Sequence, residues 1–245
     1  MIELETAWQL LLVAAFVTML AATVQATFGF GFNIISIPTL LLLSPELAPV
    51  PQLIISLTLS SATAWRERAS IQLRPIAFIV AGRVPGTVIG AGLLLLTSSQ
   101  RGVDFAVGVI VLAAVAIFAS DAGIRRNTAT EFGAGLTSGV MSTLSSIGGP
   151  PMALLYHRDT GPRVRANLGV LFFVGGLMTL TGRVAADAIS WHDVYVGLLL
   201  TPPALLGFVV SGPLRRFTEG TALRRAILII SSIAATTLLT RALLG

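Results

Sequence analysis

Apolar segments follow one another along almost the whole chain, and polar residues are confined to the short gaps between them. Most of the segments could cross a hydrocarbon layer of about 30 Å as helices, which takes about 20 apolar residues. Charged residues make up only 11% of the sequence, so no large soluble domain fits. The sequence therefore predicts an all-α integral membrane protein, a polytopic helical bundle. We place the segments at 7–27, 30–43, 47–64, 75–96, 102–120, 131–147, 150–157, 166–186, 193–213 and 222–244.

Two of these segments, 30–43 and 150–157, are too short to span, and each follows a glycine-rich break. The first break is TFGFGFNIISIP at 27–38, and the second is SSIGGPPMALLY at 145–156. Irregular backbone at membrane depth is tolerated only where protein or a wet cavity satisfies its polar groups. Each break is therefore predicted to be a hairpin tip beside a cavity, with a short helix that begins inside the membrane.

The breaks lie at corresponding places in a repeated pattern. When residues 123–245 are set beneath 1–122, the two breaks align, and the segment at 74–92 falls over 192–210. Internal repeats of this kind are common in transporter folds. We therefore predict a duplication with repeats at 1–122 and 123–245.

Arginines gather in four of the gaps and set the predicted orientation. The amino terminus and the gap at 44–46 carry only Glu3, Glu5 and Glu46. Because arginine-rich loops stay in the cytoplasm, both termini are predicted to lie outside. Each half then crosses an odd number of times, so the repeats should be inverted, each with a glycine-broken hairpin containing a short helix plus three transmembrane helices. The arginine-rich gaps are 65–74, 125–126, 158–165 and 214–225.

The residue types exclude several functions. All sixteen basic residues are arginine, which rules out the Gly-Lys-Ser/Thr motif of phosphate-loop ATPases. Cysteine is absent, and His157 and His192 lie outside any metal-binding pattern, so we expect no metal, cofactor or catalytic residue. The arginines sit in short loops, where they control topology, so no nucleic-acid partner is expected.

The breaks themselves suggest an anion site. A helix start presents free N–H donors and the positive end of the helix dipole, and two starts converging from opposite faces would bind an anion. Glycines let the bare backbone turn and approach such a ligand. We assign this role to Gly29, Gly31, Gly148 and Gly149. Helix packing alone is expected of Gly86, Gly90, Gly92, Gly175 and Gly176.

Arg83 lies in the middle of an apolar segment, where an arginine is costly and usually functional. No aspartate or glutamate lies at that depth in the predicted segments, so a substrate anion is a natural partner for the guanidinium. Snorkelling to the interface or bonding to backbone carbonyls at a hairpin tip are the alternatives. Arg183, four residues before Asp187, is instead expected to form an interfacial ion pair.

Neutral polar residues complete the candidate site. Gln52 and Asn167 align in the two repeats, which favours a shared cavity, although interhelical hydrogen bonds would also explain them. Hydroxyl groups at the breaks can donate to an anion or to helix carbonyls. The candidates are the amides Gln25, Asn33, Gln52 and Asn167 and the hydroxyls Thr27, Ser145 and Ser146.

Over essentially its whole length the chain resembles the sulfite exporter TauE/SafE family. The resemblance rests on the two glycine breaks, on GRVPGTVIGAGLLL at 82–95, and on the eight or so further apolar passes. Phe30 interrupts the first glycine cluster, and Pro38 stands where the family's proline is expected. In the second break Pro150-Pro151 replaces the usual glycine and aliphatic residue.

The resemblance implies secondary transport, often export, of small sulfur-containing or organic anions such as sulfite, sulfoacetate or other sulfonates, in the bacterial inner membrane. We expect alternating access, with the two halves rocking around a midplane site that contains Arg83. The partners would be the small anion and the lipid bilayer; a coupling proton or ion and a homodimer stay open.

Rival functions follow from the same residues. The substrate of such a transporter could also be a small carboxylate or another inorganic anion. A cation transporter would need carboxylates at depth. An intramembrane enzyme would need Ser145 or Ser146 beside a histidine, and both histidines are predicted at segment edges. We therefore expect a transporter and not an enzyme.

Overall fold

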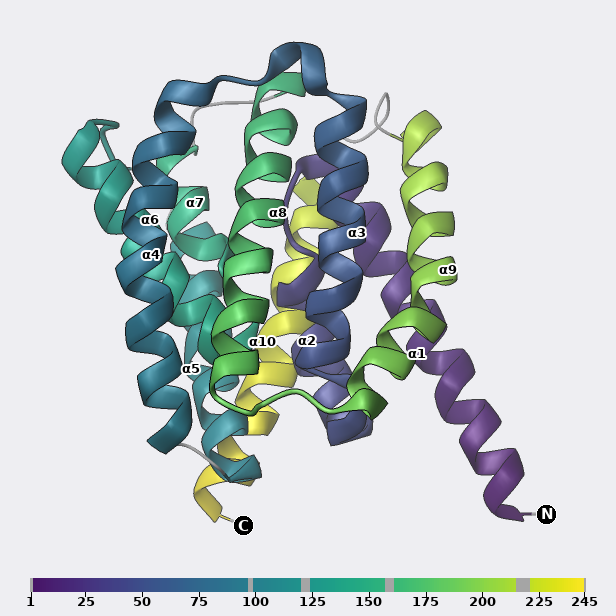
Figure 1. Cartoon of the computed structure of the whole chain (residues 1–245). Coiled ribbons are helices and arrows are strands. Elements are labelled where there is room, and N and C mark those ends of the chain that lie inside the picture. The colour runs from purple at the N-terminus through teal and green to yellow at the C-terminus, as the bar shows by residue number, and fades with distance from the viewer. Residues whose placement is uncertain (1, 97–98, 120–123, 157–160, 215–220, 245) are drawn as a thin grey trace.

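The computed structural model describes residues 2–96, 99–119, 124–156, 161–214 and 221–244 (Figure 1). Within these ranges the chain forms α-helices joined by short connections and contains no strand. Short 3₁₀ turns lie at Pro45–Leu47 and Arg68–Ser70. The helices are α1 (Ile2–Phe28), α2 (Phe32–Leu43), α3 (Val50–Arg66), α4 (Leu73–Leu96), α5 (Gln100–Ala119), α6 (Thr128–Ser145), α7 (Gly149–Leu155), α8 (Pro162–Ala185), α9 (Trp191–Leu214) and α10 (Thr221–Leu244).

Five stretches of the described chain are long and apolar enough to cross a membrane, by length and composition. They belong to α1, to α3 with the turn before it, and to α4, α8 and α9. Shorter apolar helices lie at Phe32–Leu43 and Ser231–Leu244. The prediction of an all-α polytopic membrane protein is confirmed.

Most of the close packing joins helices of one predicted half to helices of the other. The main pairs are α4 with α6, α1 with α9, α3 with α8, and α5 with α10. If α1–α5 correspond in order to α6–α10, the pair α4–α6 corresponds to the pair α9–α1. The pairs α3–α8 and α5–α10 each join a helix to its own counterpart in the other half. The inverted duplication stays a prediction. An inverted duplication would produce these four helix pairs.

In the pairs α3–α8 and α5–α10, the two helices run antiparallel. Glu67, just after α3, accepts a hydrogen bond of 2.9 Å from Arg165 in the first turn of α8. Asp104, near the start of α5, pairs with Arg241 near the end of α10 at 2.6 Å. Equivalent helices of inverted repeats would have to run in opposite directions, as these do.

Glycines bring the backbones of α4 and α6 into direct contact. A Cβ atom added to Gly86 would overlap the carbonyl oxygen of Leu136, and one added to Gly135 would overlap that of Ile79. A Cβ on Gly207 of α9 would likewise overlap the Met19 carbonyl of α1. Small residues allow this close approach of membrane helices. The two contacts fix α4 to α6 and α9 to α1.

Substituting Gly86 with alanine should therefore destabilise the protein by about 2 kcal/mol or more, because the new methyl group forces the two backbones apart. Gly92, on the same helix, is the matched control: it has no neighbour within 4 Å of an added Cβ, so Gly92→Ala should be close to neutral. Thermal unfolding in detergent measures both. Equal unfolding temperatures for the two variants would contradict this account of the α4–α6 contact.

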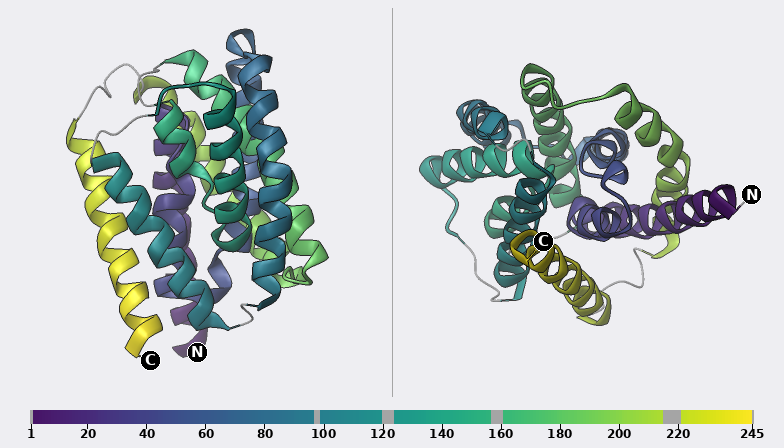
Figure 2. Two further views of the ribbon diagram at one scale, coloured as in Figure 1. Left: turned by 90° about the vertical axis from the view of Figure 1, so that its left-hand side faces the viewer. Right: turned by 90° about the horizontal axis from the view of Figure 1, so that it is seen from below.

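Both chain termini lie at one end of the bundle, and the connection from α3 to α4 lies at the other (Figures 1 and 2). That far end also carries Arg66, Arg68 and the start of α8 with Arg165. The predicted orientation expects such a separation of arginines from termini. Further members of the arginine-rich gaps, Arg158, Arg215 and Arg216, lie outside the described residues, as does His157.

The two broken hairpins differ from the prediction. The carbonyl of Ala26, near the end of α1, accepts a hydrogen bond from Arg66 at the end of α3, so α1 crosses the whole bundle before the first break. After α6, the chain folds back, because the carbonyl of Gly148 accepts a hydrogen bond from Ser138 two turns earlier in that helix. Gly31 likewise lies beside Val24 in α1, so each break runs back into the bundle along the helix before it, whereas we predicted that the hairpin tips themselves lie inside the membrane.

Candidate functional site

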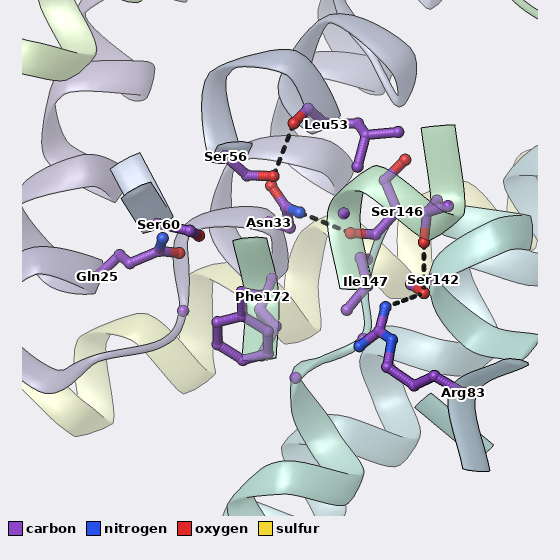
Figure 3. Close-up of a pocket in the computed structure, with 16 residues that line it drawn as sticks. Gln25, Asn33, Leu53, Ser56, Ser60, Arg83, Ser142, Ser146, Ile147 and Phe172 are labelled. Atoms are coloured by element: carbon purple, nitrogen blue, oxygen red, sulfur yellow. Dashed lines mark hydrogen bonds between the residues drawn. The ribbon is translucent and has the colours of Figure 1, made fainter. Parts of the chain in front are cut away.

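The two breaks meet inside the bundle. Asn33, in the first turn of α2, donates from Nδ2 to the carbonyl oxygen of Ser146 at the end of α6, at 2.6 Å (Figure 3). Ile34 and Phe172 are the nearest neighbours of a Cβ added to Gly149, the first residue of α7. The starts of the two short helices therefore lie close together, as predicted from their positions in the repeats.

The residues in each break explain the local path of the chain. Gly29 and Gly31 have φ angles of +93° and +112°, which glycine adopts readily and other residues rarely do. They end α1 and start α2. At the second break Ser146 ends α6 in the left-handed conformation, with φ of 59°. Pro150 and Pro151 follow in the first turn of α7, where a missing N–H costs little.

A cavity lies where the breaks meet, with about 40 Å³ of room for the centres of water-sized molecules. A single water needs about 10–15 Å³ by this measure, so the space suits about three waters or one small anion. Seven predicted site residues line it: Gln25, Gly31, Asn33, Arg83, Ser146, Gly148 and Gly149.

Two predicted amides lie elsewhere. Gln52, at the start of α3, donates to the Leu47 carbonyl at 3.2 Å, and Asn167, near the start of α8, accepts from the Gln72 backbone at 2.9 Å. Because α3 and α8 are antiparallel, their starts lie at opposite ends of the bundle. Equivalent positions near the starts of these helices therefore cannot share one cavity, and both amides stabilise nearby connections.

Thr27 and Gly29 also lie outside the lining. The Thr27 hydroxyl donates to the Thr23 carbonyl at 2.7 Å, so it bonds to its own helix and not to an anion, which was one of the two predicted alternatives. Gly29 packs against the backbone of Arg165, with an added Cβ 3.2 Å from its Cα. Ser145 likewise bonds to its own helix, at the Met141 carbonyl. Of the predicted site residues in the first break, Gly31 and Asn33 reach the cavity.

Sequence reasoning missed several polar residues of the lining. Ser56 and Ser60 come from the middle of α3, and Ser142 and Thr179 come from α6 and α8. Serines four residues apart share one face of a helix, and both Ser56/Ser60 and Ser138/Ser142 have this spacing. Serine pairs with this spacing in apolar helices were the sequence signal that could have identified these polar residues.

Arg83 is buried, with 2% of its surface exposed, and its guanidinium points to the cavity (Figure 3). Nη1 donates to the Ser138 hydroxyl at 2.8 Å and Nη2 to the Ser142 hydroxyl at 2.7 Å. Its Nε finds no hydrogen-bond partner among the described residues. Gly175 makes room for the group, since a Cβ there would overlap the guanidinium carbon. Gly175 therefore does more than pack two helices together, which differs from the prediction.

The hydroxyl partners of Arg83 are neutral and are themselves tied to the surrounding chain. Ser138 donates to the Gly148 carbonyl at 2.6 Å, and Ser142 shares a hydrogen bond of 2.9 Å with Thr179. Among the described residues that line the cavity, none is a carboxylate. A buried cation with only neutral partners is unfavourable, and an anion in the cavity would offset much of that cost.

Arg183 differs from its prediction. It is 3% exposed and donates from Nη2 to the Leu144 carbonyl at 2.8 Å, near the end of α6. Arg66 makes the equivalent contact with Ala26 near the end of α1, at 2.7 Å. Cations are favourable at the last carbonyls of a helix. Both arginines therefore stabilise the helix that precedes a break, and Arg183 does not line the cavity.

A protein-family model described as "Sulfite exporter TauE/SafE" matches residues 14–238, which is nearly the whole described chain. The matched range contains both breaks, Arg83 and the whole cavity lining. No curated protein and no solved structure matches the chain.

Proposed function

Since the chain belongs to the sulfite exporter TauE/SafE family, we propose that it is a secondary transporter that exports a small oxyanion such as sulfite or a sulfonate. Membership of the family makes it a membrane transporter of sulfite or related anions. The observation that carries the choice of an anion is Arg83, a buried guanidinium beside a cavity whose other described lining groups are uncharged. We place the protein in the inner membrane of a bacterium.

In this proposal the anion lies between Arg83 and the start of α2. The guanidinium supplies the positive charge, and the first turn of α2 supplies N–H groups at the positive end of its dipole. The start of α7 contributes less, because Pro150 and Pro151 have no N–H group to donate. Hydroxyls of Ser56, Ser60 and Thr179 can bond the remaining oxygens.

The division of the lining around the cavity suggests which parts move. One side of the cavity is made by α1, α3 and the first break, and the other by α4, α6, α8 and the second break. On the first side α9 packs on both α1 and α3, and on the second side α4 packs on both α6 and α8. We propose that these two bodies, α1/α3/α9 and α4/α6/α8, rock against each other where α3 meets α8. Each body contains helices of both halves, so rocking of 1–122 against 123–245 does not fit.

The driving force would be an ion gradient or the substrate gradient. The buried carboxylates Asp104 and Glu131 lie near the starts of α5 and α6 and pair with Arg241 and Arg126. Neither lines the cavity, so the site itself offers no described acid for carrying a proton. An intramembrane hydrolase is disfavoured, because the described lining places no histidine beside Ser146 and the Ser145 hydroxyl donates to its own helix.

Flux through liposomes that contain the purified protein tests the proposal. Sulfite and methanesulfonate should leave loaded vesicles at a saturable rate well above that of vesicles without protein. Movement of acetate but not of either sulfur anion would identify a carboxylate transporter. No protein-dependent flux of any of these anions would overturn the proposal.

A further inference from the structure

We propose that the site accepts anions that carry one negative charge and excludes anions that carry two. The inference rests on the proposed function, because it concerns the anion that the transporter carries. It selects hydrogensulfite and simple sulfonates, and it excludes the sulfite dianion, sulfate and sulfoacetate.

The described walls of the cavity contain a single charge. Arg83 is the one charged side chain among the described residues of the lining. The polar groups beside it are neutral: the amides of Gln25 and Asn33 and the hydroxyls of Ser142 and Thr179. The described walls therefore carry a net charge of one positive unit.

The charged side chains on the neighbouring helices lie away from the cavity. On α6, Glu131 pairs with Arg126 at 3.3 Å. At the start of α8, Arg165 pairs with Glu67 at 2.9 Å. Toward the other end of α8, Arg183 bonds to the backbone of α6. On α4 itself, Arg74 lies exposed in the first turn. None of these groups lines the cavity, so Arg83 is the one charged side chain of the described lining that faces a bound anion, and the start of α2 adds only the partial charge of its dipole.

A single positive charge in the wall favours anions that carry a single negative charge. The cost of taking an ion out of water rises with the square of its charge, and it must be repaid by interactions in the site. A singly charged anion beside Arg83 makes a neutral pair, whereas a doubly charged anion leaves one negative charge uncompensated in a medium of low dielectric constant. The apolar part of the wall, Phe172, Ile34 and Leu53, offers that second charge no partner.

Three anions of similar size can show whether binding depends on the charge of the anion or on its shape. Methanesulfonate carries one charge, sulfate carries two, and methylphosphonate passes from one charge to two between mildly acid and mildly alkaline buffer. Thermal stabilisation of the purified full chain at constant ionic strength gives the apparent affinity of each. We expect methanesulfonate to bind equally at both pH values, sulfate to bind at least about 100-fold more weakly, and methylphosphonate to lose its affinity in the alkaline buffer.

The variants Arg83→Gln and Arg74→Gln form a matched pair on α4. The first should abolish the response to methanesulfonate and the second should preserve it. Binding of sulfate as tight as that of methanesulfonate, or methylphosphonate binding that is retained in alkaline buffer, would overturn the inference and leave the transporter intact. If none of the three anions stabilises the protein, and sulfite does not cross the liposome membrane either, the proposed function fails as well.

Discussion

Replacing Arg83 with glutamine should reduce anion flux by about 100-fold or more while the protein still folds and inserts. The substitution removes the positive charge that balances the substrate, and one charge at close range accounts for a loss of this size. Stability should be unchanged or higher, because the variant no longer buries a guanidinium whose partners are neutral hydroxyls. Sulfite efflux from liposomes and thermal unfolding in detergent measure the two effects.

The controls for this experiment come from the same helix. Arg83→Lys keeps the charge but not the fork that reaches Ser138 and Ser142, so it should restore flux only in part. Arg74→Gln removes an exposed charge and should leave flux unchanged. Normal flux through the Arg83→Gln variant would remove Arg83 from the transport site.

A disulfide between α3 and α8 should stop transport, whereas one between α4 and α6 should not. The first joins the two proposed bodies, and the second lies within one of them. For α3 and α8 the pair is Leu57→Cys with Gly176→Cys, since a Cβ on Gly176 lies 3.3 Å from Leu57 Cγ. For α4 and α6 it is Gly90→Cys with Thr143→Cys, whose Cβ atoms would lie 2.8 Å apart. A disulfide holds its Cβ atoms about 3.5–4.5 Å apart, so α4 and α6 must part slightly to form the second bridge.

The chain contains no cysteine, so each pair can be oxidised without competing thiols. Flux should fall about tenfold or more on oxidation of the Leu57/Gly176 pair and recover on reduction, since a closed interface cannot alternate. The single variant Gly176→Cys shows whether the added side chain alone obstructs the cavity. Full flux through the oxidised α3–α8 variant, or a block by the oxidised α4–α6 variant, would contradict the proposed division into bodies.

The sequence was informative where a residue conflicts with its surroundings. Gly29 and Gly31 interrupt an apolar segment, and both adopt φ angles that require glycine, so their spacing predicted the break. Arg83 conflicts with an apolar helix in the same way, and it lies in the cavity. Such conflicts can be recognised from the sequence alone, because the residue is unfavourable in its own local segment.

Other features depend on how helices face one another, which spacing along the chain does not determine. Gln52 and Asn167 matched as repeat equivalents, yet antiparallel packing of α3 and α8 places them at opposite ends. Arg183 looked interfacial because it lies near a helix end, but that end is covered by the last turn of α6. The serines that hold Arg83 were missed because a hydroxyl in a membrane helix usually bonds to its own backbone.

The interleaving of the two halves has a consequence for biosynthesis. When α4 leaves the ribosome, its glycine face has no partner, because α6 has not yet been made. Likewise α1 waits through seven further helices for α9 to cover the carbonyl of Met19. The first half must therefore persist in the bilayer as a loose set of inserted helices, and the compact bundle assembles late, once the carboxy-terminal helices arrive.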